Sequence, residues 1–339
     1  MKFTHLASFF FSRKPSQVAF LLTLRCNSRC SWCHSWQEPK TKELNLKEIG
    51  SIFKQLKRFG IKLLYLSGGE PLFRKDILKI IKLASDFGFD LILVTNGTLL
   101  NPPIIHRLVK FHNLRLNVSL DSLDKNLYQK IRGIDALERV LKNLQFFRKA
   151  YPHYPLRITM TVSAANLEET DKVFQFCQKN RFYFSPNPYY PSGRFRKKSP
   201  LHDYQKINKQ LIIYYQKMAQ KVKTEPYLSG LPLVYRKLID WLMGKMKEPC
   251  GAGEELLYLD PRGLVYACQD LAPFADLTTQ DLGKEWSKKS WQPAVKKCSQ
   301  ETPCFIFCSR SPYIIKHHKI KITYDLLTSP KLLHYFKMY

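Results

Sequence analysis

Three cysteines near the start of the chain stand close enough together to bind one metal centre. Cys26, Cys30 and Cys33 lie within eight residues of one another. A closed zinc or iron–sulfur site normally has four protein ligands, so three ligands leave one coordination position for a substrate or cofactor. The spacing therefore predicts a metal centre that performs chemistry. The alternative is a structural zinc site completed by His34 or by a distant cysteine.

Glycine and polar residues follow the next three predicted strands, at the point where each strand ends. They are Gly68, Gly69, Glu70 and Pro71 after the second strand, Asn96 after the third, and Ser119 and Asp121 at the fourth. In barrels of parallel strands, functional groups lie on the loops that leave the carboxyl ends of the strands. We therefore expect these residues to share one rim with the three cysteines.

Between Val18 and Asn187, short apolar or β-branched runs alternate with amphipathic stretches, which is typical of repeated βα units. The predicted strands are Val18–Leu24, Lys62–Ser67, Leu91–Thr95, Arg115–Leu120, Arg157–Val162 and Phe182–Pro186. The predicted helices are Leu46–Phe59, Lys75–Phe87, Pro102–Lys110, Ala136–Ala150 and Leu167–Lys179. Each helix is long enough for a right-handed crossover. The pattern predicts the α/β class, with a partial (β/α)6 barrel of the TIM type and a smaller C-terminal cysteine-rich domain.

The βα rhythm stops near Gly193, where we place a domain boundary. The predicted parts are a basic and apolar segment 1–17, the barrel 18–193, a helical basic linker region 194–249, the cysteine-rich domain 250–308 and a basic tail 309–339. The tail holds an amphipathic stretch, Lys331–Met338. Only about 17 residues precede the first strand, so we expect no N-terminal peptide-recognition domain.

The cysteine spacing, with Trp32 before the last cysteine, resembles the CxxxCxΦC signature of the radical S-adenosylmethionine (radical SAM) superfamily. Gly68-Gly69-Glu70-Pro71 resembles the family's second hallmark, and the resemblance continues through Val118–Ser122 and Tyr128–Gly133 to about Gly193. It implies a [4Fe–4S] cluster on the three cysteines, with SAM at the fourth iron. Reductive cleavage of SAM would then give a 5′-deoxyadenosyl radical that abstracts hydrogen from a substrate.

The resemblance also implies a set of cofactor-binding residues. They are Trp32, Gly68, Gly69, Glu70, Pro71, Asn96, Ser119, Asp121 and Arg132. Gly68 and Gly69 would let the backbone approach the methionine moiety closely, since glycine has no Cβ. Glu70 would accept a hydrogen bond from the ammonium group of that moiety.

Three members of the set have alternatives that the sequence leaves open. Ser119 and Arg132 suit ribose or carboxylate contacts, because a hydroxyl and a guanidinium bind those groups. The alternatives are a capping serine and a surface arginine. Trp32 would lie against the adenine or pack under its loop.

A second group of cysteines is spread along the C-terminal part of the chain. Its members are Cys250, Cys268, Cys298, Cys304 and Cys308. The segment resembles the SPASM or twitch extensions of radical SAM enzymes, which carry auxiliary iron–sulfur clusters. It lacks a cysteine at Val295 and beyond Cys308, so we predict one auxiliary [4Fe–4S] cluster, with zinc as the alternative. Cys177 stands alone on a predicted helix and is assigned to the core.

The residues after Cys268 bear on catalysis. In relatives that oxidise peptidyl side chains, an acid directly after the equivalent cysteine acts as base. Here Gln269 occupies that position, and Asp270 follows it. Asp270 is therefore our candidate catalytic residue, and the substrate class stays open among peptides or proteins, lipids and sugars.

The composition constrains partners and location. The chain has 339 residues, with 55 Lys and Arg against 27 Asp and Glu, a formal charge of +28. Each turnover that consumes SAM needs an electron at the cluster. Because the chain is positively charged, we predict an acidic electron donor, a flavodoxin or ferredoxin. An anionic membrane surface is the alternative, suggested by Phe9–Phe11 beside Arg13 and Lys14.

No apolar run reaches the ~18 residues of a membrane helix, and no secretory signal is recognisable. We expect a cytoplasmic protein, with peripheral membrane association as the alternative. A basic nucleic-acid-binding protein with structural zinc sites is the competing function, although we expect no nucleic-acid partner.

Overall fold

The computed structural model describes residues 14–38, 41–190, 208–301, 304–305 and 307–329. Three features discussed above lie outside these residues: the Phe9–Phe11 stretch, the boundary near Gly193 and the amphipathic Lys331–Met338. None of the helices in the described ranges combines the length and the apolar character needed to cross a membrane.

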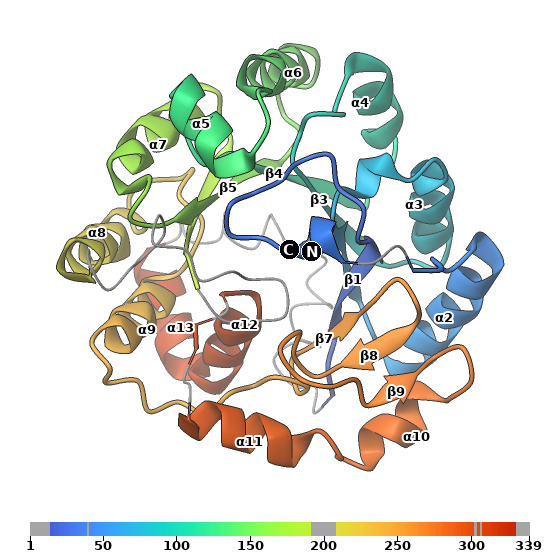
Figure 1. The fold of residues 1–339 in the computed structure, drawn as a ribbon. Helices are drawn as coiled ribbons and strands as arrows, with labels where there is room; N and C mark the ends of the chain where they lie inside the picture. Colours follow the sequence, from blue (N-terminus) through green and yellow to red (C-terminus); the bar gives the residue numbers. More distant parts are fainter. Residues whose placement is uncertain (1–13, 39–40, 191–207, 302–303, 306, 330–339) are drawn as a thin grey trace.

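Six parallel strands form an open barrel, as the alternating pattern predicted (Figure 1). The strands are β1 (Gln17–Thr23), β2 (Leu63–Gly68), β3 (Asp90–Thr95), β4 (Leu114–Ser119), β5 (Leu156–Val162) and β6 (Tyr183–Pro188). Each of these strands pairs in parallel with the next one in sequence. The carboxyl ends therefore meet at one rim, where the loops with unusual residues begin.

Helices cover the outer face of this sheet. They are α2 (Leu46–Phe59), α3 (Ile77–Asp86), α4 (Pro102–Leu108), α5 (Lys125–Arg132), α6 (Leu137–Ala150) and α7 (Thr170–Lys179), with 3-10 turns at Ser35–Gln37, Pro71–Phe73 and Leu167–Glu169. Helix α2 begins with a capping box, in which Asn45 and Glu48 exchange hydrogen bonds of 3.0 and 2.7 Å. The helical periodicity did not predict α5, because its eight residues are mostly polar.

The two faces of the strands differ in polarity. On β4, Leu114, Leu116 and Val118 are buried in the core cluster, while Arg115 and Asn117 alternate with them and are half-buried. Alternation places these two sets on opposite faces of the sheet. The apolar face packs against the helices, so the other face lines the interior of the barrel with polar groups.

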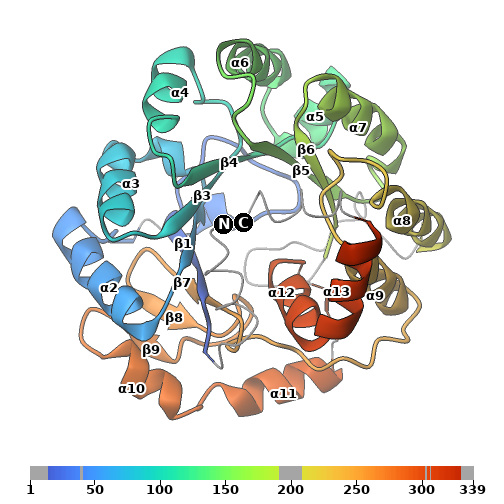
Figure 2. The same ribbon diagram turned by 180° about the vertical axis from the view of Figure 1, so that it is seen from behind.

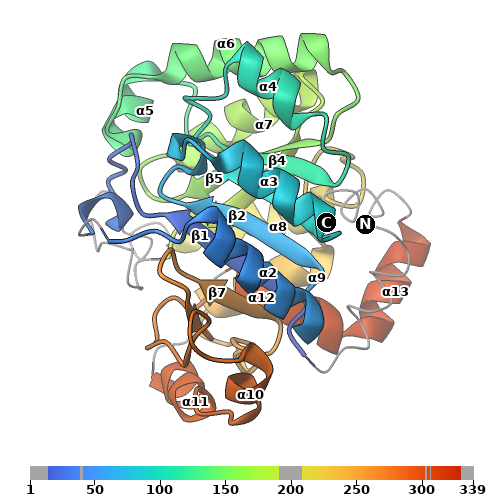
Figure 3. The same ribbon diagram turned by 90° about the vertical axis from the view of Figure 1, so that its right-hand side faces the viewer.

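The C-terminal part continues the same sheet. Strands β7 (Leu256–Leu259), β8 (Leu264–Tyr266) and β9 (Ala275–Asp276) follow β1, giving the order β6-β5-β4-β3-β2-β1-β7-β8-β9. β7 is parallel to β1, whereas β8 and β9 are antiparallel additions. Helices α10 (Leu282–Ser287) and α11 (Gln292–Glu301) lie at the end of the molecule away from α4 and α6 (Figure 3).

Four further helices occupy the side on which the sheet does not close, between β6 and β7 (Figures 1 and 2). They are α8 (Asn208–Lys221), α9 (Pro232–Leu242), α12 (Phe307–His317) and α13 (Lys319–Thr328). The expected helical region is divided into α8 and α9, and Pro232 begins the second helix, where a proline costs no hydrogen bond. Lys316 on α12 binds Glu255 beside β7 at 2.8 Å. This contact joins the helices to the sheet.

Candidate cofactor site

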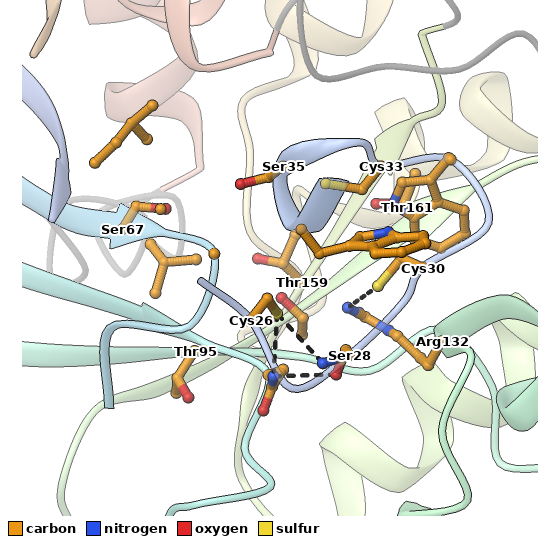
Figure 4. A pocket seen from close by; sticks show the side chains of 18 of the residues that line it. Cys26, Ser28, Cys30, Cys33, Ser35, Ser67, Thr95, Arg132, Thr159 and Thr161 are labelled. Atoms are coloured by element: carbon orange, nitrogen blue, oxygen red, sulfur yellow. Dashed lines mark hydrogen bonds between the residues drawn. The ribbon is translucent and has the colours of Figure 1, made fainter. Parts of the chain in front are cut away.

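A cavity of about 330 Å³ lies at the carboxyl ends of the strands (Figure 4). It brings together the three cysteines of the first motif and most of the residues predicted to share their rim. The lining residues from the predicted set are Cys26, Cys30, Trp32, Cys33, Gly68, Gly69, Asn96, Ser119 and Arg132. The expectation that these loops converge is therefore met by the geometry, while the role of each residue stays a prediction.

The cysteine loop is held in place by the end of α5. The backbone N–H groups of Arg29 and Ser31 donate to the carbonyl oxygens of Arg132 and Ile131 at 3.0 and 2.9 Å. Gly133 follows with φ of 64°, and a Cβ there would lie 2.4 Å from the carbonyl oxygen of Arg29. Only glycine accepts both this φ and this approach at low cost. The loop and the helix end therefore form one unit.

Gly68 and Gly69 are required by the backbone of the first strand. A Cβ on Gly68 would lie 2.1 Å from the carbonyl oxygen of Thr23, and one on Gly69 would lie 2.2 Å from that of Arg25. The N–H groups of Gly69 and Glu70 donate to these same two carbonyls at 2.7 and 2.9 Å. The close approach of two strand ends is therefore a second reason for these glycines, and the predicted contact with the methionine moiety stays a prediction.

Glu70 is fully buried and fastens two loops together. Its carboxylate accepts hydrogen bonds from the Leu72 N–H at 3.0 Å, the Thr95 hydroxyl at 2.7 Å and the Asn96 N–H at 2.7 Å. Burial raises the pKa of Glu70 to about 7, although these three bonds oppose the shift. It is not among the residues that line the cavity. These contacts account for Glu70 structurally, and the proposed ammonium contact stays a prediction.

Asn96 connects the end of β3 to the cysteine loop. Its side-chain amide donates to Asn27 Oδ1 at 2.8 Å, to Ser28 Oγ at 3.1 Å and to Cys26 Sγ at 3.9 Å. The Ser28 N–H also donates to Cys26 Sγ at 3.4 Å. Two neutral donors thus face the first sulfur.

Arg132 is buried, so the surface-arginine alternative is wrong. Its guanidinium forms an ion pair with Asp121, donates to Cys30 Sγ at 3.8 Å and lies 5.7 Å from the ring centre of Trp32. Its Nε–H is buried and has no hydrogen-bond partner in the described part of the chain. An unpaired buried donor is costly, so this atom is suited to an acceptor that enters the cavity.

The remaining predicted residues occupy distinct positions. Asp121 is fully buried and accepts from the Thr161 N–H at 2.7 Å. Pro71 begins a 3-10 turn outside the cavity lining. Trp32 is buried against Ile131 and Tyr189, which agrees with packing under its loop, and it also lines the cavity. Its contact with the adenine stays a prediction.

The donor set fits a metal cluster chemically. Burial raises the pKa of Cys26 to about 11 and also raises that of Cys30, so both thiols keep their protons until a metal displaces them. In the described ranges, no three His, Cys, Asp or Glu side chains are already arranged to hold a metal ion. In a four-iron cluster each cysteine binds a different iron, so the three sulfurs need not converge on one ion.

Sequence reasoning missed several lining residues. Thr159 and Thr161 on β5, Asn187 on β6 and Gln269 from the C-terminal part all line the cavity, whereas Asp270 does not. The inward face of β5 and β6 could have been found by counting alternate positions from the strand ends. The position of Gln269 depends on how the C-terminal part folds back, which no local pattern specifies.

The second group of cysteines is brought together by tertiary packing. Cys268 is buried in a small cluster with Trp291 and Val295, and Cys250 packs against it. Burial raises the pKa of Cys268, and nearby Asp270, Cys304 and Cys250 raise it further. The side chain of Cys308 lies outside the described residues.

Cys177 is fully buried within the main core, which confirms its structural assignment.

Residues 20–177 match the family model of the Radical SAM superfamily. This part of the chain is therefore a radical SAM domain, as the two sequence hallmarks indicated. The AdoMet-dependent heme synthase of Methanosarcina barkeri is 36% identical over 168 residues, which are 49% of this chain and 48% of that protein. The probable GTP 3′,8-cyclase of Pyrococcus abyssi is 37% identical over 153 residues, 45% of this chain and 49% of that protein. The chain thus matches about half the length of these relatives.

Solved structures resemble the chain over a greater length. Streptococcus suis SuiB bound to S-adenosylmethionine has a TM-score of 0.66 at 18% identity, covering 91% of this chain and 78% of that one. Native anSMEcpe with bound AdoMet has a TM-score of 0.65 at 16% identity, covering 95% and 96%. At these identities the likeness shows a shared fold, which includes the C-terminal part.

Proposed function

We propose that this chain is a radical SAM enzyme with a [4Fe–4S] cluster on Cys26, Cys30 and Cys33. The observation that carries the proposal is the cavity, where these thiols meet the unpaired Nε–H of Arg132. When bound, the cluster and SAM supply reductive cleavage of the sulfonium and a 5′-deoxyadenosyl radical, which abstracts hydrogen from a substrate. The chain supplies binding, orientation and exclusion of water.

The residues that would hold SAM have separate tasks in this proposal. Arg132 Nε donates to the carboxylate of the methionine moiety, since it is the buried donor without a partner. The Ser119 hydroxyl makes a second contact to carboxylate or ribose, and Trp32 lies against the adenine. Asn96 keeps Cys26 in position through the contacts given above.

The C-terminal cysteines are proposed to bind one auxiliary [4Fe–4S] cluster. Cys250 and Cys304 both lie within electrostatic range of Cys268, which supports a common centre. Either Cys298 or Cys308 would be the fourth ligand. Zinc is the competing occupant, because a closed site of four thiolates suits both metals.

The substrate is proposed to present a neutral polar group to the radical. Ser67, Thr159, Thr161, Asn187 and Gln269 line the cavity, and none of them carries a charge. Peptide amides and sugar hydroxyls suit such donors and acceptors. SuiB has been solved with its precursor peptide SuiA, which is consistent with a peptide substrate for this fold.

The proposed reductant is an acidic flavodoxin or ferredoxin. The exposed Arg29 lies beside the first cysteines, and the exposed Lys130 lies on the helix that holds their loop. Arg25 is also exposed there but is paired with Glu43 at 3.0 Å. This positive surface suits an acidic partner. Association with an anionic membrane is the alternative use of the charge, and competing binding to anionic vesicles would reveal it.

Anaerobic reconstitution with iron and sulfide tests the proposal. The protein should turn brown and form 5′-deoxyadenosine from SAM and dithionite. Cys30→Ala should form none, because the open-site cluster needs all three ligands. Cys177→Ala is the matched control, since that buried thiol lies in the core and should leave activity intact. Colourless protein with bound zinc would instead support the nucleic-acid-binding alternative.

A further inference from the structure

Arg132 makes a charged contact to one cluster ligand. Its Nη1 donates to Cys30 Sγ at 3.8 Å, as the dashed line in Figure 4 shows. The side chain is only 8% exposed. A charge excluded from water acts more strongly on its neighbours than an exposed one, since less solvent screens it. The guanidinium can therefore influence any charge on that sulfur.

The sulfurs of Cys26 and Cys30 differ in the donors that face them. Cys26 receives the neutral N–H of Ser28 and the amide of Asn96. Cys30 receives the guanidinium of Arg132. Hydrogen bonds to charged groups are about twice as strong as neutral ones. The charged donor thus acts on one corner of the predicted cluster.

Asp121 fixes this guanidinium in place. Its carboxylate pairs with Arg132 Nη2 and accepts the Thr161 N–H at 2.7 Å, and its side chain is fully buried. The negative charge of Asp121 partly offsets the positive charge of Arg132. Substitutions of the two residues should consequently change the field at Cys30 in opposite directions.

We infer that Arg132 is a positioning residue that raises the reduction potential of the first cluster through Cys30. This inference rests on the proposed function. Reduction adds one negative charge to the cluster, and a hydrogen-bonded cation beside a ligand stabilises that charge. Hydrogen bonds to cluster sulfurs and nearby charge are established determinants of the potential. This role is separate from the contact between Arg132 Nε and SAM, because it is exerted without the cofactor.

The test is a redox titration of the reconstituted protein without SAM, followed by the electron paramagnetic resonance signal of the reduced cluster. Arg132→Gln should lower the potential, so that the ratio of reduced to oxidised cluster at a fixed applied potential falls about tenfold, or about 59 mV for one electron. Asp121→Asn should raise the ratio. Arg132→Lys keeps the charge and should fall between wild type and Arg132→Gln.

The matched control is Arg115→Gln. Arg115 faces Asp90 at 3.9 Å and is 13% exposed, but it lies at the opposite end of β4 from the rim. About four residues of strand separate it from that end, or roughly 13 Å. This variant should leave the potential of the first cluster unchanged.

Two failures can be distinguished. Wild-type protein that binds no iron at the first motif would overturn the proposed function. The inference alone would be overturned if the wild-type protein has a normal cluster and the variants keep their iron with an unchanged reduction potential. These variants are Arg132→Gln, Arg132→Lys and Asp121→Asn. The inference would also be overturned if Arg132→Gln and Asp121→Asn shift the reduction potential in the same direction. That result would indicate a general loosening of the site, which changes the potential of both variants in the same way.

Discussion

The two cysteine regions of this chain are assembled in different ways. Cys26, Cys30 and Cys33 lie on a single loop, which two backbone hydrogen bonds fasten to the end of α5. Cys250, Cys268 and Cys304 are far apart in sequence, and packing around Trp291 and Val295 brings two of them together. The first region depends on local spacing and close backbone contacts, and the second depends on the fold of the whole C-terminal part.

The largest expected effect concerns the backbone contact beneath the first loop. Gly69→Ala would put a Cβ 2.2 Å from the Arg25 carbonyl oxygen and 2.7 Å from that of Leu24. Backbone atoms cannot yield as a flexible side chain does, so we expect a loss of about 3 kcal/mol or more, with loss of iron from the first motif. Urea denaturation and iron analysis measure both effects.

Gly50→Ala provides the control for that substitution. Gly50 lies inside helix α2, and its Cβ would lie 3.6 Å from a Leu83 methyl group, an ordinary contact. Alanine should stabilise the helix by about 0.5–1 kcal/mol. If both variants were equally stable, the first loop would not depend on the close approach at Gly69.

The next effect tests whether the two regions bind metal independently. With two four-iron clusters the protein should hold about eight irons, and Cys268→Ala should remove about half. The first loop does not use the packing around Trp291, so the variant should still form 5′-deoxyadenosine. Iron analysis together with product chromatography checks this. Loss of all iron would show that the regions assemble as one unit, and about four irons plus zinc in the wild type would refute the auxiliary cluster.

The contrast between the regions also explains what the sequence could predict. Strand and helix periods are local, so β1 to β6 and the shared rim were predicted within a residue or two. The spacing of Cys26, Cys30 and Cys33 is local as well. The pairing of β7 with β1 joins residues about 240 positions apart, and no periodic pattern encodes such a partner.

Errors in the site arose from contacts that are not local. Arg132 has the sequence context of a surface helix end, yet it is buried by the loop that folds over it. Asp270 was preferred as the catalytic candidate for its carboxylate, but Gln269 is the residue that lines the cavity. Residue chemistry therefore identified the neighbourhood, while orientation had to come from the structure.

The smallest expected effect compares the surfaces of the two regions. Arg29 is exposed on the first loop and Lys284 is exposed on α10 in the second region. Arg29→Glu and Lys284→Glu change the net charge equally. If the electron donor docks over the first loop, Arg29→Glu should slow reduction by flavodoxin several-fold, and Lys284→Glu should not.

The wild-type rate of reduction by flavodoxin should also fall as salt rises, because the screening length shrinks to about 8 Å at physiological ionic strength. Dithionite as the reductant controls for changes in the cluster itself. Equal slowing by both variants would mean that only the total charge of +28 attracts the donor. The first loop would then not be the docking surface.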